Sequence, residues 1–363
     1  MKRIFILFAV MMMAVGLSAD EAILIDFSKL NADIIQLVEG IDSNGDPILA
    51  VDEKGDPIYT QNRATIMDYG AVAGGSFTTE QKRMMKTSLA IRNWTVRLNS
   101  SARTVVREVL TYADEAESKL FGTVMGVRIS FPTEPWNAHA FIRPPFEIPA
   151  FEAAGNINDQ GRITPTSSGV TSISRFEGPV EDGSKKPAFA YGVVKNVGTI
   201  KSVQVAVYGL QFPHSISVIL IDNEGNEHIY HVDYLNYDGW AELSWSNPAY
   251  VQQVRNREIK LNPLYPTSTP FVKFGGFLIK RDADKAGGDF ICYFKDVKII
   301  YDKAVLDTDR DIDDEGLWHI IRDREILKKK WEMSRFGQQQ ILRYLELQKQ
   351  ATESSFSPYP KED

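Results

Sequence analysis

Residues 199–245 hold the pattern that most constrains the fold, because apolar and polar side chains alternate there in several short runs. The runs at 203–208 and 215–220 have the two-residue period of strands with one buried face. The turn-forming sequence Asn-Glu-Gly-Asn at 223–226 separates the second run from a third at 229–235. Consecutive strands of this kind need a second sheet to cover their apolar face. The chain is therefore predicted to be mostly β, with an antiparallel β-sandwich at its centre.

Other parts of the chain continue this pattern. Further strands are predicted at 23–27, 94–98, 124–131, 271–279 and 290–301, the last two as a hairpin. A short helix is expected at 115–120, and the Gly-, Ser- and Thr-rich stretch 150–187 is expected to form loops. The sequences DSNGDPI and DEKGDPI repeat turn chemistry between residues 40 and 60, which predicts a loop or hairpin insertion there.

The character of the sequence changes after the last predicted strand. Residues 302–315 contain seven acidic side chains, and 316–350 contain no proline but have apolar residues at helical spacing. The predicted organisation is a leader at 1–19, a sandwich domain at 20–315, and a C-terminal helix with a frayed tail at 316–363.

The C-terminal helix carries an apolar stripe beside a basic stretch, since residues 322–335 contain six positive and three negative side chains. An exposed stripe of this kind would suit contacts between molecules, and truncation before it should leave a folded chain that no longer assembles. The alternative is that the helix covers its own sandwich. The predicted assembly interface consists of Leu317, Trp318, Ile321, Leu327, Trp331, Ile341, Leu342, Tyr344 and Leu345.

The first residues have the three parts of a secretory signal peptide. Lys2 and Arg3 precede an apolar run at 4–15, and Leu-Ser-Ala follows, so cleavage is predicted between Ala19 and Asp20. A membrane anchor is the alternative, but the apolar run is short for a span. We expect an exported, periplasmic chain with no membrane anchor after cleavage.

The net charge argues against one class of partner, and the cysteine content indicates an inert thiol. The formal net charge is −7, and no dense basic patch interleaved with aromatics occurs, which argues against nucleic acid as a partner. The single cysteine, Cys292, lies in an apolar run and is predicted to be a buried, inert thiol.

No pattern in the chain predicts catalysis, a metal or a cofactor. The acidic run beginning at Asp311 resembles a calcium loop, but Arg322 occupies the twelfth position, where the loop needs Glu. His228 and His231 are three apart on a predicted strand and so face opposite sides. We predict that the protein is not an enzyme.

Three aromatic residues near the end of the alternating region, Tyr237, Trp240 and Trp245, are open to two readings. They could stack on a sugar, with Tyr237 and Trp240 as the platform, or they could fill the core and its interfaces. The first reading gives the alternative function of a periplasmic carbohydrate-binding module.

Several long stretches, among them MGVRISFPTEPWNAHAFIRPPFEIPAF and GGFLIKRDADKAGGDFICYFKDVKIIYDKAVLD, give the chain a family resemblance. Over most of residues 65–350 it resembles the spirochaete flagellar filament outer-layer, or sheath, proteins. The resemblance implies a structural role in the periplasmic flagellum, with core flagellin subunits and neighbouring copies or sister sheath subunits as partners. The run GGDFICYFKDVKIIYD also resembles the closing strand of galactose-binding-like jelly rolls, which implies that form of sandwich.

Overall fold

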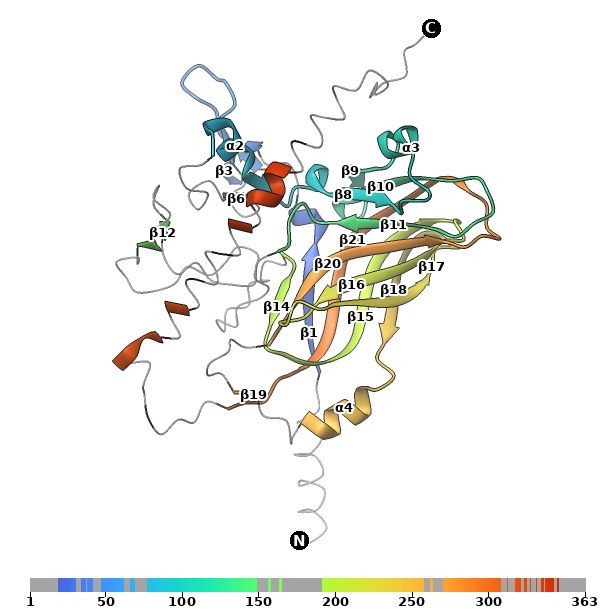
Figure 1. Ribbon diagram of the computed structural model, residues 1–363. Helices are drawn as coiled ribbons and strands as arrows, with labels where there is room; N and C mark the ends of the chain where they lie inside the picture. Colours follow the sequence, from blue (N-terminus) through green and yellow to red (C-terminus); the bar gives the residue numbers. More distant parts are fainter. Residues whose placement is uncertain are drawn as a thin grey trace, which may run out of the picture.

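Two antiparallel sheets stacked face to face form the body of the protein (Figure 1). The computed structural model describes residues 19–30, 34–61 with gaps at 37 and 42–46, 66–68, 77–148, 156–157, 163–164, 191–257, 262–263 and 270–307. It also describes single residues and short runs between 312 and 345. The predicted antiparallel β-sandwich is confirmed.

The first sheet has six strands, with the long β21 near its centre. β21 pairs with β15 along one side, and with β10 and then β1 along the other. The strand order is β18–β15–β21–β10–β9, for Asp238–Ser246, Val197–Leu210, Gly288–Lys303, Gly122–Phe131 and Tyr112–Ser118, with β1 at Asp20–Asp26.

The second sheet repeats this plan around β20, which pairs with β16 on one side and with β11 and β14 on the other. Its strand order is β17–β16–β20–β11–β8, for Glu227–Tyr234, Ser215–Ile221, Phe271–Arg281, Ala138–Arg143 and Thr95–Leu98, with β14 at Val193–Lys195.

Strands that are neighbours in sequence are divided between the sheets, which corrects two expectations. Of the four strands in the alternating region, only β16 and β17 form a hairpin, closed by a turn in which Gly225 has a φ of +89°. β15 and β18 pair with each other in the first sheet. The predicted hairpin of β20 and β21 is also wrong, because these strands lie in different sheets and residues 282–287 connect them.

Two local expectations also fail. The residues predicted to be helical at 115–120 belong mostly to β9, which pairs with β10, while the nearby helix is α3 at Val105–Val109. β16 is buried along its whole length, so Ser215, Ser217 and Ile219 do not face solvent as the alternation suggested.

The remaining elements are short and lie outside the two six-stranded sheets. They are η1 (Phe27–Lys29), β2 (Ile34–Gln36), β3 (Val38–Ile41), β4 (Pro47–Leu49), β5 (Tyr59–Gln61), β6 (Ile66–Asp68), α2 (Thr79–Met84), β7 (Lys86–Ser88), η2 (Ile91–Asn93), β12 (Asn156–Ile157), β13 (Ile163–Thr164), α4 (Tyr250–Arg257), β19 (Asn262–Pro263) and β22 (Leu306–Asp307).

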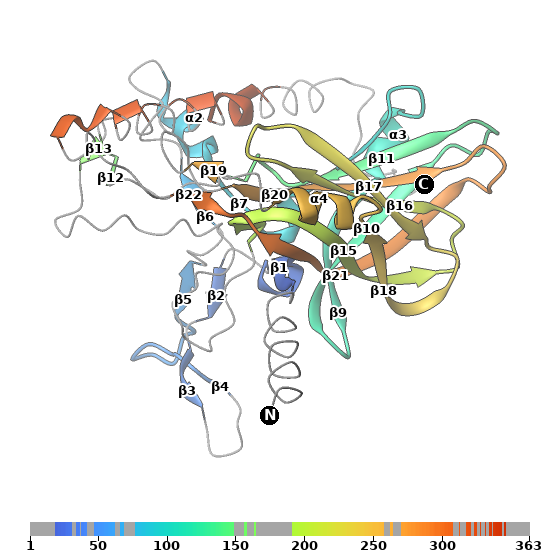
Figure 2. The same ribbon diagram turned by 90° about the horizontal axis from the view of Figure 1, so that it is seen from below.

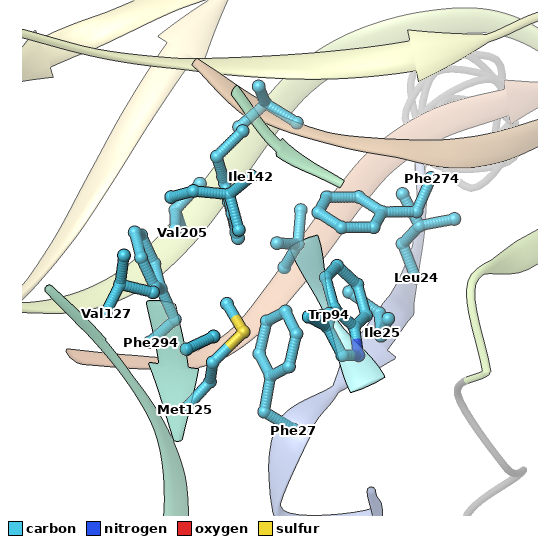
Figure 3. Packing of buried hydrophobic residues seen from close by; sticks show 14 of the residues in the cluster. Leu24, Ile25, Phe27, Trp94, Met125, Val127, Ile142, Val205, Phe274 and Phe294 are labelled. Carbon is cyan, nitrogen blue, oxygen red and sulfur yellow. The ribbon is translucent and has the colours of Figure 1, made fainter. Parts of the chain in front are cut away.

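Aromatic side chains dominate one end of the core (Figure 3). Phe277 of β20 and Phe294 of β21 stack across the two sheets at 4.2 Å between ring centroids. Phe27, just after β1, lies against both rings and meets Trp94 edge-on at 5.3 Å. Cys292 is also fully buried, and burial raises the pKa of its thiol, as expected of an inert side chain.

A buried arginine joins the loops at the other end of β20. Arg281 is 1% exposed, and its guanidinium donates hydrogen bonds to the carbonyl oxygens of Pro132, Glu134 and Lys285 at 2.7–3.0 Å. A buried cation needs such partners, since an unpaired one would be very costly. Arg281 therefore fixes the 132–136 and 282–287 connections against each other.

Candidate assembly surfaces

The C-terminal segment presents large apolar side chains to solvent. We call residues 317–331 the arm; the residues described within it are mostly helical. Five of its apolar side chains are between 51% and 76% exposed, namely Leu317, Trp318, Ile320, Leu327 and Trp331. Surface apolar residues are common singly, so a group of five in one segment makes the arm a candidate contact surface.

The end of the same segment is fastened to the sandwich. Arg335 donates to Glu147 at 3.0 Å, and Glu147 also pairs with the nearly buried Lys273 of β20 at 2.6 Å. Gln340 donates to the carbonyl oxygen of Pro145, and Ile341 is 5% exposed within the hydrophobic core. Figures 1 and 2 show the helical pieces, in orange and red, to one side of the two sheets, with the last, red piece nearest to α2.

The predicted interface residues are thus divided. Ile341 belongs to the fastened end and is covered by its own chain. Ile321 and Tyr344 lie outside the described residues. Exposed positions are Leu317, Trp318, Leu327, Trp331, Leu342 and Leu345.

A groove of ≈ 800 Å³ lies at one end of the sandwich, between the start of β15 in the first sheet and the β16–β17 turn of the second. We call it the end groove. Its apolar lining includes Val197, Ile200, Leu220, Phe271 and the rings of Tyr230 and Trp245. The groove falls in the size range of sites that hold small molecules or side chains of a partner.

Tyr230 of β17 and Trp245 of β18 form the aromatic wall of the end groove, with ring centroids 4.2 Å apart. Both side chains are half-buried, so part of each remains exposed to solvent. Asn247 and Gln253 add amide groups and are hydrogen-bonded to each other at 2.8 Å.

The charge of the end groove is negative. Burial alone would raise the pKa of Asp222, but hydrogen bonds from His228, Asn226 and the amide of Glu224 outweigh it and lower that pKa to about 2. Asp222 is therefore ionised at neutral pH. Asp222 and Glu224 both line the groove, and no Lys or Arg is among the described residues that do so.

The two predicted sugar-stacking residues lie elsewhere and are engaged in packing. Trp240 projects from the first sheet and meets Tyr208 and Phe121 edge-on at 5.5 and 5.0 Å. Tyr237 is half-buried, its hydroxyl donates to the carbonyl oxygen of Val207, and burial raises the pKa of that hydroxyl. Neither residue lines the end groove, whereas Trp245 does.

Sequence reasoning named Trp245 but did not find the groove. Trp240 and Trp245 are five residues apart on one strand, so they face opposite sides of the sheet. This odd spacing could have shown from the sequence that the two tryptophans lie on different faces of the sheet. The partner ring Tyr230 comes from a strand of the other sheet, and no sequence pattern predicts that meeting.

The first strand begins directly after the predicted cleavage point. β1 begins at Asp20, which pairs with Tyr301 of β21. Of the predicted leader at 1–19, residues 1–18 lie outside the described residues. Among the described residues, no helix has the length and apolar character to cross a membrane, and no cluster of three His, Cys, Asp or Glu side chains could hold a metal ion.

The fold and its surfaces define a β-sandwich protein with an exposed apolar arm and a groove at one end of the sandwich. Residues 58–310 match the model of a family described as flagellar filament outer layer protein, FlaA. The chain is 47% identical over 366 residues to the flagellar filament outer layer protein of Treponema pallidum, covering 99% of this chain and 97% of the relative. It is 38% identical to the protein of that name from Spirochaeta aurantia, with 94% and 90% covered. The chain belongs to the flagellar filament outer layer protein family.

Similarity to solved structures is much weaker. The chain has a TM-score of 0.25 and 9% identity to a carbohydrate-binding module complexed with beta-1,4-galactotriose, covering 58% of this chain and 88% of that one. The family 11 carbohydrate-binding module of a Clostridium thermocellum cellulase has the same TM-score and identity, with 60% and 91% covered. Similarity at this level supports no conclusion about the detailed fold or about a ligand.

Proposed function

We propose that this protein is a non-catalytic structural subunit of the periplasmic flagellum, forming the outer layer around the flagellin core. Its partners are core flagellin subunits and neighbouring copies or sister subunits of the same layer. The observation that carries the proposal is the exposed apolar arm, found in a chain that belongs to the flagellar filament outer layer protein family. A heterologous contact repeated along a filament lets such a layer propagate.

Export through an N-terminal signal peptide is part of the proposal. Cleavage between Ala19 and Asp20 would leave β1 whole, because the first paired residue of that strand is Asp20. Mass spectrometry of the protein isolated from cells should find Asp20 as its first residue. A chain that keeps residues 1–19 in the periplasm would contradict this.

The test of the function is cofractionation with purified periplasmic filaments, together with cryo-electron microscopy of the same filaments. We expect the protein to be enriched with the filaments, and density outside the flagellin core to disappear when its gene is deleted. A protein found wholly in the soluble periplasmic fraction would refute the proposal.

The arm is tested by substitution, because truncation would also remove the buried Ile341 and the Arg335–Glu147 pair. Leu327→Ala combined with Trp331→Ala should leave the fold intact, since both side chains are exposed, and should lower the filament-bound amount. Trp136→Ala is the matched control, an exposed tryptophan on a sandwich loop. If the wild type, the Leu327→Ala/Trp331→Ala double variant and the Trp136→Ala control bind filaments equally, the arm is not part of the contact.

Carbohydrate binding is the second candidate, favoured by the Tyr230–Trp245 wall of the end groove. Glycan-array binding that Trp245→Ala abolishes would support it, and Trp240→Ala tests the platform predicted from the sequence. If titration with glycans shows no binding by the wild type or by either variant, carbohydrate binding is contradicted.

A further inference from the structure

We propose that the arm of one copy docks in the end groove of the next copy, so that a head-to-tail contact builds the outer layer. This rests on the proposed function and adds the receptor for the arm. The two surfaces belong to different parts of the molecule: the arm follows the sandwich, while the end groove is lined by residues of β15, β16, β17, β18, β20 and α4.

The first argument is that each surface carries apolar side chains that no described residue covers completely. The arm exposes Leu327 and Trp331 at positions one helical turn apart. The end groove offers a wall of two aromatic rings above the aliphatic floor of Val197 and Leu220. An amphipathic helix that lays its apolar face in such a groove is a common mode of recognition.

The second argument is charge. The end groove carries Asp222 and Glu224, and the hydrogen bonds around Asp222 keep it ionised. The arm carries five positive side chains against two negative ones between 322 and 331. Opposite charge of this kind steers association and disfavours wrong partners.

The third argument is symmetry. An arm and a groove on different parts of one chain make a heterologous contact, which gives an open array unless the rotation between copies closes a ring. An open array is what a layer along a filament requires. A two-fold contact between two arms would instead stop at the dimer.

Photo-crosslinking tests the contact directly. Trp331 is replaced by benzoylphenylalanine in the full chain, and ¹⁵N-labelled and unlabelled copies are mixed and added to filaments from a deletion strain. Crosslinks of mixed isotope that join position 331 to peptides 222–230 or 245–253 are expected. Crosslinks to flagellin, to the same copy, or to another part of a neighbour would overturn the inference while leaving the outer-layer function standing. Failure of the protein to bind the filaments would overturn both.

A charge reversal in the groove gives the second readout. Glu224→Arg is expected to abolish the crosslink, because it puts a positive side chain in the path of a basic arm. Glu53→Arg is the matched control, since Glu53 is an exposed acid in a comparable Gly-containing turn. If both variants lose the crosslink, or if neither does, the pairing of the arm with the end groove is refuted. A glycan that binds in the groove without blocking the crosslink would also refute it.

Discussion

His214 should make the stability of this protein fall as the solution becomes mildly acidic. The imidazole is 3% exposed and lies between the rings of Phe131 and Phe290, at 4.9 and 4.7 Å between centroids. Neither ring nitrogen has a hydrogen-bond partner among the described residues. Burial, and then the nearby Arg281 cation, lowers the pKa of His214 from 6.5 to about 4.

The sign and size of the effect follow from linkage. Because the pKa is lower in the folded state, the unfolded chain takes up the proton first, so stability is lost as pH falls below 6.5 and levels off below the folded pKa of about 4. Near pH 5 the difference from neutral pH is about 2 kcal/mol, since each pKa unit is worth about 1.4 kcal/mol.

The assay is urea unfolding of the mature protein at about pH 7.5 and about pH 5, with wild type, His214→Leu and His231→Leu. His214→Leu removes the titrating group from an apolar site and should lose about 2 kcal/mol less than wild type between the two pH values. His231 is exposed on β17 and serves as the control that keeps the wild-type pH dependence. If His214→Leu shows the same drop as wild type, His214 is not the group that titrates.

Three further predictions concern packing, each checked by urea unfolding or by the temperature of unfolding. Phe27→Ala should cost about 3–5 kcal/mol, because it leaves a cavity among stacked rings, whereas the exposed Phe121 should tolerate alanine with a loss below about 1 kcal/mol. Arg281→Met should cost about 3 kcal/mol or more, because several loop carbonyls lose their donor; unchanged stability would show that water replaces it. Gly276→Ala should cost more than about 2 kcal/mol, since Gly276 has a φ of +126° and an added Cβ would collide with the carbonyl oxygen of Ile142; normal folding of that variant would contradict the geometry.

Alternation in the sequence located the strands of the alternating region well, because burial of one face imposes a period of two. Val203, Val205 and Val207 are all fully buried, and the turn at 223–226 closes a hairpin. The two-residue period indicates which side chains of a strand face the core, but the strands of both sheets face the same core. The sequence pattern therefore gave no signal for the sheet to which each strand belongs, and the expected hairpin of β20 and β21 proved to be a crossing between sheets.

The same limit applies to the candidate surfaces. Helical spacing groups Ile341 with Leu327, yet only Ile341 is buried, because the segment around Pro145 and Glu147 lies against that end of the helix. Such a contact joins residues nearly two hundred positions apart and leaves no local mark. Exposure of the arm and the position of the end groove both depend on tertiary contacts of this kind.

The proposed arm contact also predicts how strong assembly should be. Its five exposed apolar side chains are partly covered already, so full burial would contribute about 5–10 kcal/mol at roughly 1.5–3 kcal/mol for each complete side chain. Association costs about 4–15 kcal/mol in lost freedom of motion. One arm contact is therefore close to balanced, and purified protein should be mostly monomeric in dilute solution. On a filament, contacts with the core and with both neighbours add to one another, and the second contact is formed at a high effective concentration. We expect sedimentation velocity to find monomers and filament binding to be cooperative; stable oligomers in dilute solution without filaments would show that the arm contact is stronger than its area allows.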